Sequence, residues 1–217
     1  MNPLISAQQS AFFSQNGYIE FENLLSPEEC EQIRNEAVKG KKKLTPEQLY
    51  IGGRDLWRQS NFLKTLLLSR RMGAIATGLC NKSPLRLGCD QWIPLECKWP
   101  SPAKGKDLLS FQGIALLYLI RISPAAEEEK ILPTFRYEPG LIPLPASQGS
   151  ALMVNPNLIL NFPKMVLYSP TDLYLVAYTL TNAVYVHNLK DPSNAMLKQL
   201  GYNFGDKLKT EHHPLIV

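Results

Sequence analysis

The chain has 217 residues, of which 45% are hydrophobic and 19% charged, and its 23 Lys and Arg against 19 Asp and Glu give a net charge of +4 at pH 7. This apolar fraction suffices for a packed core and excludes a wholly disordered chain. No apolar run approaches the ~20 residues that span a bilayer, and the first residues lack the basic and apolar stretches of an export signal. We therefore expect a cytoplasmic protein that does not engage a membrane.

The first half of the chain predicts a short extended segment over 18–21 followed by helices. Ser26, Pro27 and Glu29 supply an N-cap, a first-turn proline and a capping-box partner. They predict a helix that ends at Gly40 and buries Cys30, Ile33 and Ala37. Residues 45–48 repeat the same pattern for a shorter helix, and apolar spacing predicts two more helices, from Ser60 to about Leu68 and from Ser69 to about Leu79.

The second half changes to short apolar runs bounded by Pro, Gly and Asn, which is typical of strands. The predicted strands are Leu85–Cys89, Ile114–Ile122, Ala151–Val154, Leu158–Leu160 and Leu173–Leu180. A late helix is predicted to start at Asp191-Pro192 and to end before Gly201. Helices followed by antiparallel strands indicate an α+β fold, with a barrel or jelly-roll core behind N-terminal helices.

No linker divides the chain, so we expect one domain over 1–217. Within it, 1–84 form a mostly helical flank, 85–190 form the β core, and 191–217 form a C-terminal helix and tail.

Three stretches resemble phytanoyl-CoA dioxygenase-like proteins, whose fold is a double-stranded β-helix. The first runs from Phe13 through Gly17-Tyr18 to Asn23-Leu-Leu-Ser-Pro-Glu-Glu29, and the second covers 62–72. The third is Gln148-Gly-Ser-Ala-Leu-Met-Val-Asn-Pro-Asn157, and the closing 213–216 is also like a common family ending. The resemblance implies the same fold that the order of helices and strands predicts.

The resemblance also implies a reaction, because family members use Fe(II) and 2-oxoglutarate to hydroxylate small molecules or acyl groups. Two His and one carboxylate hold the iron and leave positions open for the co-substrate and dioxygen. The first His and the carboxylate form a His-x-Asp/Glu pair, and an Arg near the distal His grips 2-oxoglutarate through two hydrogen bonds.

This chain departs from that pattern at nearly every ligand position. Where the family has His-x-Asp, the chain has Gly105-Lys106-Asp107, so that a carboxylate is kept and the histidine is not. The distal His falls near Leu160, beside Asn161. The Arg falls near Leu173 or Tyr174; no Arg follows Arg136, and Lys164 is the nearest cation. A lysine lacks the guanidinium fork. We expect no iron and no 2-oxoglutarate, and hence no catalytic residue.

Two functional alternatives stay open. A metal site could be rebuilt from His187 with His212 or His213 and with Asp107 or Asp90, which would give an active oxygenase with an unorthodox centre. If no metal binds, we expect His187 to be a partly exposed loop residue and His212-His213 to lie in a solvated tail. A nucleic-acid-binding regulator would use Lys39 and Lys41–Lys43, with Arg70-Arg71 and Lys207 or Lys209; the simpler interpretation is that these lysines complement a helix C-terminus.

Weaker patterns each have a structural interpretation. Cys80, Cys89 and Cys97 could ligate a metal, but without a C-x-x-C pair, buried thiols are favoured, for Cys30 as well. Residues 52–55 resemble a phosphate loop but lack a P-loop lysine, so a turn is favoured. Cys89, Asp90 and His187 could form a nucleophilic set, although nothing in the sequence brings them together.

If the barrel interior is open, it binds an unidentified small-molecule or protein ligand. Candidate residues for the lining of that pocket are Asp90, Trp92, Trp99, Tyr118, Arg121, Asn161 and Tyr174. Side chains on core strands also serve simply as packing. The leading hypothesis is a degenerate member of the Fe(II)/2-oxoglutarate-dependent dioxygenase fold that acts by binding.

Overall fold

The structure is a computed structural model that describes residues 5–39, 44–98, 100–124 and 141–216. Four α-helices that the sequence predicts are present in the first half: α2 (Pro27–Val38), α3 (Pro46–Gly52), α4 (Asn61–Leu67) and α5 (Arg70–Cys80). Their N-caps are Ser26, Thr45, Ser60 and Ser69, and each cap side chain accepts a hydrogen bond from a backbone N–H of the first turn. The predicted end of α2 at Gly40 lies outside the described residues.

The regular structure at the N-terminus begins earlier than the sequence predicts, because a helix precedes strand β1. Helix α1 (Ala7–Asn16) was not predicted, although Ser6 and Gln9 form a capping box and Gly17 ends the helix with a left-handed φ of 77°. Strand β1 (Tyr18–Phe21) follows at the predicted position. The sequence does contain a signal for this helix, because Ser followed three residues later by Gln is a capping box, which marks a helix N-terminus.

The core is an antiparallel six-stranded sheet with the order β1-β5-β4-β7-β2-β8. Its strands after β1 are β2 (Leu85–Ile93), β4 (Phe111–Arg121), β5 (Ala151–Val154), β7 (Leu173–Tyr185) and β8 (Leu215–Ile216). A second sheet contains β3 (Ala103–Lys104) and β6 (Ile159–Leu160). The predicted strands are therefore confirmed, whereas the two-residue strands β3 and β8 were not predicted.

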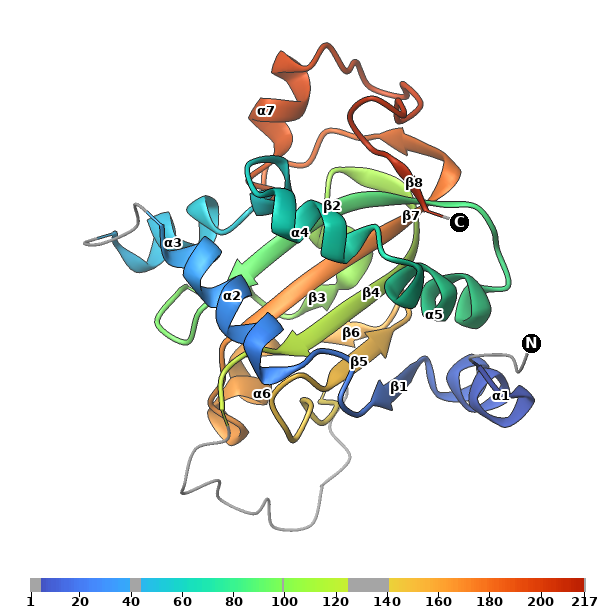
Figure 1. Ribbon diagram of the computed structural model, residues 1–217. Helices are drawn as coiled ribbons and strands as arrows, with labels where there is room; N and C mark the ends of the chain where they lie inside the picture. Colours follow the sequence, from blue (N-terminus) through green and yellow to red (C-terminus); the bar gives the residue numbers. More distant parts are fainter. Residues whose placement is uncertain (1–4, 40–43, 99, 125–140, 217) are drawn as a thin grey trace.

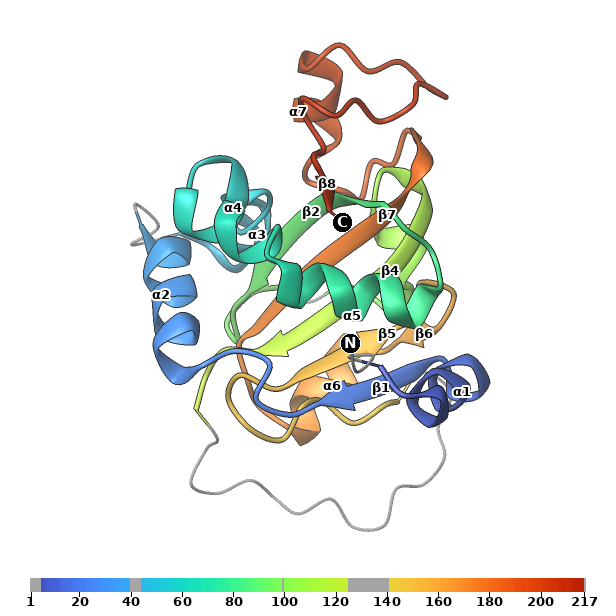
Figure 2. The same ribbon diagram turned by 45° about the vertical axis from the view of Figure 1, so that its right-hand side comes forward.

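The large sheet has two covered faces, visible in Figures 1 and 2. Helices α2, α4 and α5 lie over one face, which we call the helix-covered face. The small sheet and α6 (Phe162–Tyr168) lie on the opposite side, so the two sheets enclose a second apolar cluster, which we call the barrel interior. This arrangement is the predicted α+β fold with a double-stranded β-helix core.

Three short elements complete the chain. Two 3-10 helices, η1 (Leu56–Arg58) and η2 (Gly105–Leu108), follow α3 and β3, and α7 (Asn194–Gln199) lies beyond β7. The late helix is thus confirmed, although Ser193 and not Asp191 is its N-cap. Within the described residues no helix is long and apolar enough to cross a membrane.

Two of the sequence stretches that carry the family resemblance contact each other. The backbone N–H of Leu25 donates to the carbonyl of Gly149 at 2.9 Å, and that of Asn23 donates to Ser150 Oγ at 3.3 Å. Gly149 has a φ of +82°, and a Cβ there would lie 2.1 Å from the Leu25 carbonyl oxygen. A glycine is therefore required where the segment before α2 crosses the start of β5.

Candidate functional site

The positions expected to hold iron meet at the pairing of β3 with β6. Ala103 pairs with Leu160 in the small sheet, and the N–H of Gly105 donates to the carbonyl of Leu158 at 3.3 Å. The segment Gly105–Asp107 and the position of the distal His are therefore neighbours in space. This geometry is consistent with the positions that the family resemblance implies.

Buried apolar side chains lie at or next to the two positions where the resemblance implies histidines. A Cβ built at Gly105 would lie 2.2 Å from Leu117 Cδ1, and Leu117 is itself fully buried in the barrel interior. Leu160 belongs to the same cluster and has no exposed surface. A side chain larger than hydrogen at position 105 would require Leu117 to move within a close-packed interior.

The remaining expected ligand positions also lack suitable groups. Asp107 lies on η2 and is exposed. Leu173 and Tyr174, the two residues near which the Arg was expected, are fully buried, the first in the barrel interior and the second under the helices. Lys164 is exposed on α6. In the part of the chain that the structure describes, no three His, Cys, Asp or Glu side chains are grouped to hold a metal ion. These residues do not fit a ferrous centre, whose ligands are His and carboxylate.

The alternative pair of His187 and Asp107 lies on adjacent segments. Asn188 Nδ2 donates to the backbone carbonyl of Asp107 at 3.0 Å, so the loop after β7 contacts η2. His187 is exposed, and its Nε2 lies 3.3 Å from Lys198 Nζ. An ammonium that donates to this nitrogen uses the lone pair that a metal would need.

The two late histidines do not form a solvated tail, which corrects that interpretation. His213 is fully buried, and its Nδ1 lies 3.2 Å from the carbonyl of Leu87 and 3.0 Å from that of Gly88. Both contacts are with acceptors, so Nδ1 carries the proton. Burial lowers the pKa of His213 to about 3.

A buried polar network joins η1 to the segment before α7, and sequence reasoning missed it. Arg54 Nη2 lies 3.1 Å from Asp191 Oδ1, and both side chains are almost completely buried. Ser193 Oγ donates to Asp55 Oδ2 at 2.5 Å. Burial raises the pKa of Asp55. Gly52 ends α3 and residues 53–55 form a turn before a 3-10 helix, as favoured; the side chains of Arg54 and Asp55 are buried.

Asp90 occupies a separate buried position on the helix-covered face. Its Oδ2 accepts hydrogen bonds from the N–H of Trp57, at 3.2 Å, and from the hydroxyl of Tyr174. Burial, reinforced by the charge of Asp55, raises the pKa of Asp90 to about 7. This carboxyl group connects β2 and β7 to η1.

The proposed nucleophilic set is not assembled. Cys89 faces the barrel interior and lies 3.1 Å from Arg54 Nη1, whereas Asp90 contacts groups on the helix-covered side and His187 is exposed. Burial raises the pKa of the Cys89 thiol, which opposes formation of a thiolate. Cys30 and Cys97 are buried and Cys80 is partly exposed, all as free thiols.

Most of the candidate pocket residues lie away from the barrel interior. Trp92, Tyr118 and Tyr174 belong to the cluster under the helices, and the Tyr118 hydroxyl donates to the Met72 carbonyl at 2.8 Å. Asn161 is the N-cap of α6. Trp99 lies outside the described residues.

Arg121 is the candidate that lies at one end of the barrel. Its side chain, at the end of β4, is fully buried. Its Nη1 donates to the Pro145 carbonyl at 3.2 Å and to Ser169 Oγ at 3.3 Å. Protein oxygens thus accept hydrogen bonds from this buried guanidinium. We assign Arg121 a structural role at the end of the barrel.

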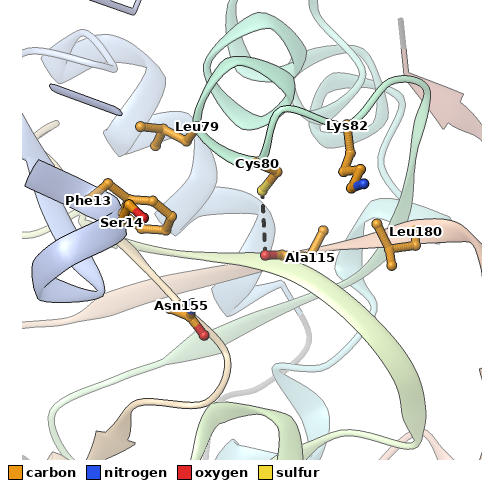
Figure 3. A pocket seen from close by; sticks show the side chains of 8 residues that line it. All are labelled: Phe13, Ser14, Leu79, Cys80, Lys82, Ala115, Asn155 and Leu180. Carbon is orange, nitrogen blue, oxygen red and sulfur yellow. Dashed lines mark hydrogen bonds between the residues drawn. The ribbon is translucent and has the colours of Figure 1, made fainter. Parts of the chain in front are cut away.

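Residues that the structure describes line two cavities on different sides of the molecule. The first, which we call the mouth cavity, has a volume of about 310 Å³ and is bordered by Ala103 and Leu108, on either side of Gly105–Asp107. The second, which we call the α1–α5 groove, has a volume of about 280 Å³ and is lined by Phe13, Ser14, Cys80, Lys82 and Asn155, among others (Figure 3). In the groove the Cys80 thiol donates to the Ala115 carbonyl at 3.4 Å. The mouth cavity is the one next to the expected metal positions.

The fold is that of the cupin-like 2-oxoglutarate oxygenases. No family model matches the sequence, and no curated protein matches it either. Among solved structures, the chain is similar to the non-heme α-ketoglutarate dependent carbocyclase SnoK from nogalamycin biosynthesis, with a TM-score of 0.72 and 16% identity over 99% of this chain and 97% of SnoK.

Two further solved structures support the same fold. The non-heme α-ketoglutarate dependent epimerase SnoN from nogalamycin biosynthesis has a TM-score of 0.66 and 16% identity over 96% of this chain and 97% of SnoN. EctD from S. alaskensis, in its apoform, has a TM-score of 0.55 and 13% identity over 87% of this chain and 82% of EctD. At these identities the likeness defines the architecture, and the chemistry depends on the side chains of the site.

Proposed function

We propose that this chain is a non-catalytic binding protein built on the fold of the Fe(II)/2-oxoglutarate-dependent dioxygenases. The observation that carries the proposal is the clash that a side chain at position 105 would make: a Cβ there would lie 2.2 Å from Cδ1 of Leu117, which is fully buried. Leu160 and Leu173 fill the places of the distal histidine and the arginine in the same cluster. Together these three substitutions remove the groups that would hold iron and its co-substrate.

Kinship with the phytanoyl-CoA dioxygenase-like proteins is part of the same proposal. It is supported by the contact between Leu25 and Gly149, which joins two of the resembling stretches. The fold is kept while the ligand positions are apolar. We expect this combination in a protein that has lost its catalytic role. Its function would then depend on surfaces and cavities outside the former metal centre.

The test is a measurement of iron and co-substrate binding by the purified chain. Fe(II) and 2-oxoglutarate are titrated anaerobically by calorimetry, and succinate is measured after oxygen is admitted. EctD, whose solved structures include one with bound Fe and one with 2-oxoglutarate, serves as the positive control. We expect no stoichiometric binding and no succinate above the blank.

Tight, stoichiometric binding of both would overturn the proposal. The alternative of an active oxygenase then predicts that succinate formation disappears in His187→Ala or Asp107→Ala. The contact of Asn188 with the Asp107 carbonyl favours this pair over other combinations, because it brings the two segments together. Neither residue is buried, so both variants should fold and the comparison should be interpretable.

The nucleic-acid alternative gains no support from the described residues. Lys41–Lys43 lie outside them, and Lys39 pairs with Glu36. A binding constant that does not change with salt would argue against phosphate contacts.

A further inference from the structure

We propose that the mouth cavity binds a small organic anion with an apolar body, such as an aromatic carboxylate. This inference rests on the proposed binding function and names the site and the ligand class. The residues that line the cavity include two lysines, Lys98 and Lys190, together with Tyr50 and Leu108.

The positive charge in the mouth cavity is available to a ligand. Lys190 is exposed. Its backbone N–H, and not its ammonium group, donates a hydrogen bond to Asn188 Oδ1. Lys98 Nζ lies 3.6 Å from Glu47 Oε1, with both side chains more than half exposed. An ion pair between exposed side chains is weak in water, so an incoming anion can replace Glu47.

The apolar part of the cavity is fixed by the fold. The carbonyl of Tyr50 accepts a hydrogen bond from Gln91 Nε2 at 2.8 Å, which ties the end of α3 to β2. Leu108 is buried at the end of η2, and Pro100 and Pro102 restrict the backbone that forms another wall. A volume of about 310 Å³ is at the lower end of the ~300–1,000 Å³ of small-molecule pockets. The space is therefore sized for a ring with one charged substituent.

Charge and shape together distinguish this cavity from the α1–α5 groove. The lining of the groove includes one cation, Lys82, which lies beside Leu180 and across the pocket from Ser14 and Asn155 (Figure 3). Two cations beside an aromatic ring match a carboxylate attached to an apolar body, because each ammonium can donate a charge-assisted hydrogen bond. The groove serves as an internal reference for the experiment.

The test is isothermal titration of the full chain with benzoate, using benzamide and acetate as comparisons. We expect benzoate to bind with a stoichiometry of one, and benzamide and acetate to bind at least about tenfold more weakly. Lys98→Met and Lys190→Met should each weaken benzoate binding about tenfold. Lys82→Met, which changes the net charge equally, should leave binding unchanged.

The outcomes separate this inference from the proposed function. Equal binding of benzoate and benzamide, an equal effect of all three lysine variants, or no binding of benzoate would overturn the inference. None of these results involves iron or succinate, so the proposal of a non-catalytic protein would stand. Conversely, succinate formation with benzoate bound as expected would overturn the proposed function alone.

Discussion

Arg54 and Asp191 form an ion pair inside the protein, with side chains that are 4% and 0% exposed and with 3.1 Å between Nη2 and Oδ1. The pair joins the turn before η1 to the segment before α7, which are far apart in the sequence. Asp191 also accepts hydrogen bonds from the backbone N–H groups of Ser110 and Ser193. The carboxylate therefore organises three segments at one end of the large sheet.

Loss of the arginine from this pair should strongly destabilise the fold. Arg54→Met leaves the Asp191 carboxylate buried without its counterion, and breaking a buried pair in this way costs about 3–5 kcal/mol. Urea unfolding followed by circular dichroism measures the change. Arg71→Met is the matched control, because Arg71 pairs with Glu29 at a partly exposed position and its loss should cost about 1 kcal/mol or less. Similar losses in the two variants would contradict the assignment of a structural role to Arg54.

The close approach of Gly105 to Leu117 predicts a steric penalty for any side chain at position 105. Gly105→Ala should reduce the free energy of unfolding by about 1–3 kcal/mol, because overpacking a core forces its neighbours to shift. Leu117→Ala alone should cost about 2–5 kcal/mol through the cavity it leaves. In the double variant, Gly105→Ala should add little, since the clashing methyl group is gone. Additive losses would show that Leu117 does not limit the space at position 105.

The buried carboxyl of Asp90 predicts a dependence of stability on pH. Its pKa is raised from 3.8 to about 7 by burial, so the folded protein holds a proton that the unfolded chain releases between these values. Stability should therefore fall as pH rises from about 4 to about 7, by at most ~1.4 kcal/mol for each pH unit from this group. Asp90→Asn should flatten this part of the stability curve. If wild type and variant run parallel between pH 4 and 7, Asp90 does not carry the proton.

The buried imidazole of His213 predicts that stability falls as pH falls, which is opposite to the effect of Asp90. Its pKa is lowered from 6.5 to about 3 by burial, so below pH 6.5 the unfolded chain takes up a proton that the folded protein does not. Its contribution is present above pH 6.5 and is lost as pH falls from 6.5 toward 3. His213→Gln should remove this loss relative to wild type. His187→Gln, at an exposed position, should keep it, and a loss that persists in both variants would exclude His213 as its source.

The sequence by itself determined the local elements, because their signals lie within a few residues. Ser26 with Glu29 and Thr45 with Gln48 start helices through hydrogen bonds between side chain and backbone three positions apart, and the structure contains these bonds. The absence of His from the expected ligand positions was likewise visible in the sequence alone. Even α1 and α6, which were not predicted, have local caps in Ser6 and Asn161.

Only the tertiary structure decided which side chains meet. Trp92, Tyr118 and Tyr174 were expected in the barrel, but they face the helices, because the face of a strand is assigned by what packs on it. The pairing of Arg54 with Asp191 joins residues separated by 137 positions, and no local pattern encodes it. The burial of His213 likewise depends on the C-terminal segment, which pairs with β2 at the edge of the sheet and brings His213 to the carbonyls of Leu87 and Gly88. Periodicity fixes the alternation of side chains along a strand, whereas the choice of partner for each face is made by packing between distant segments.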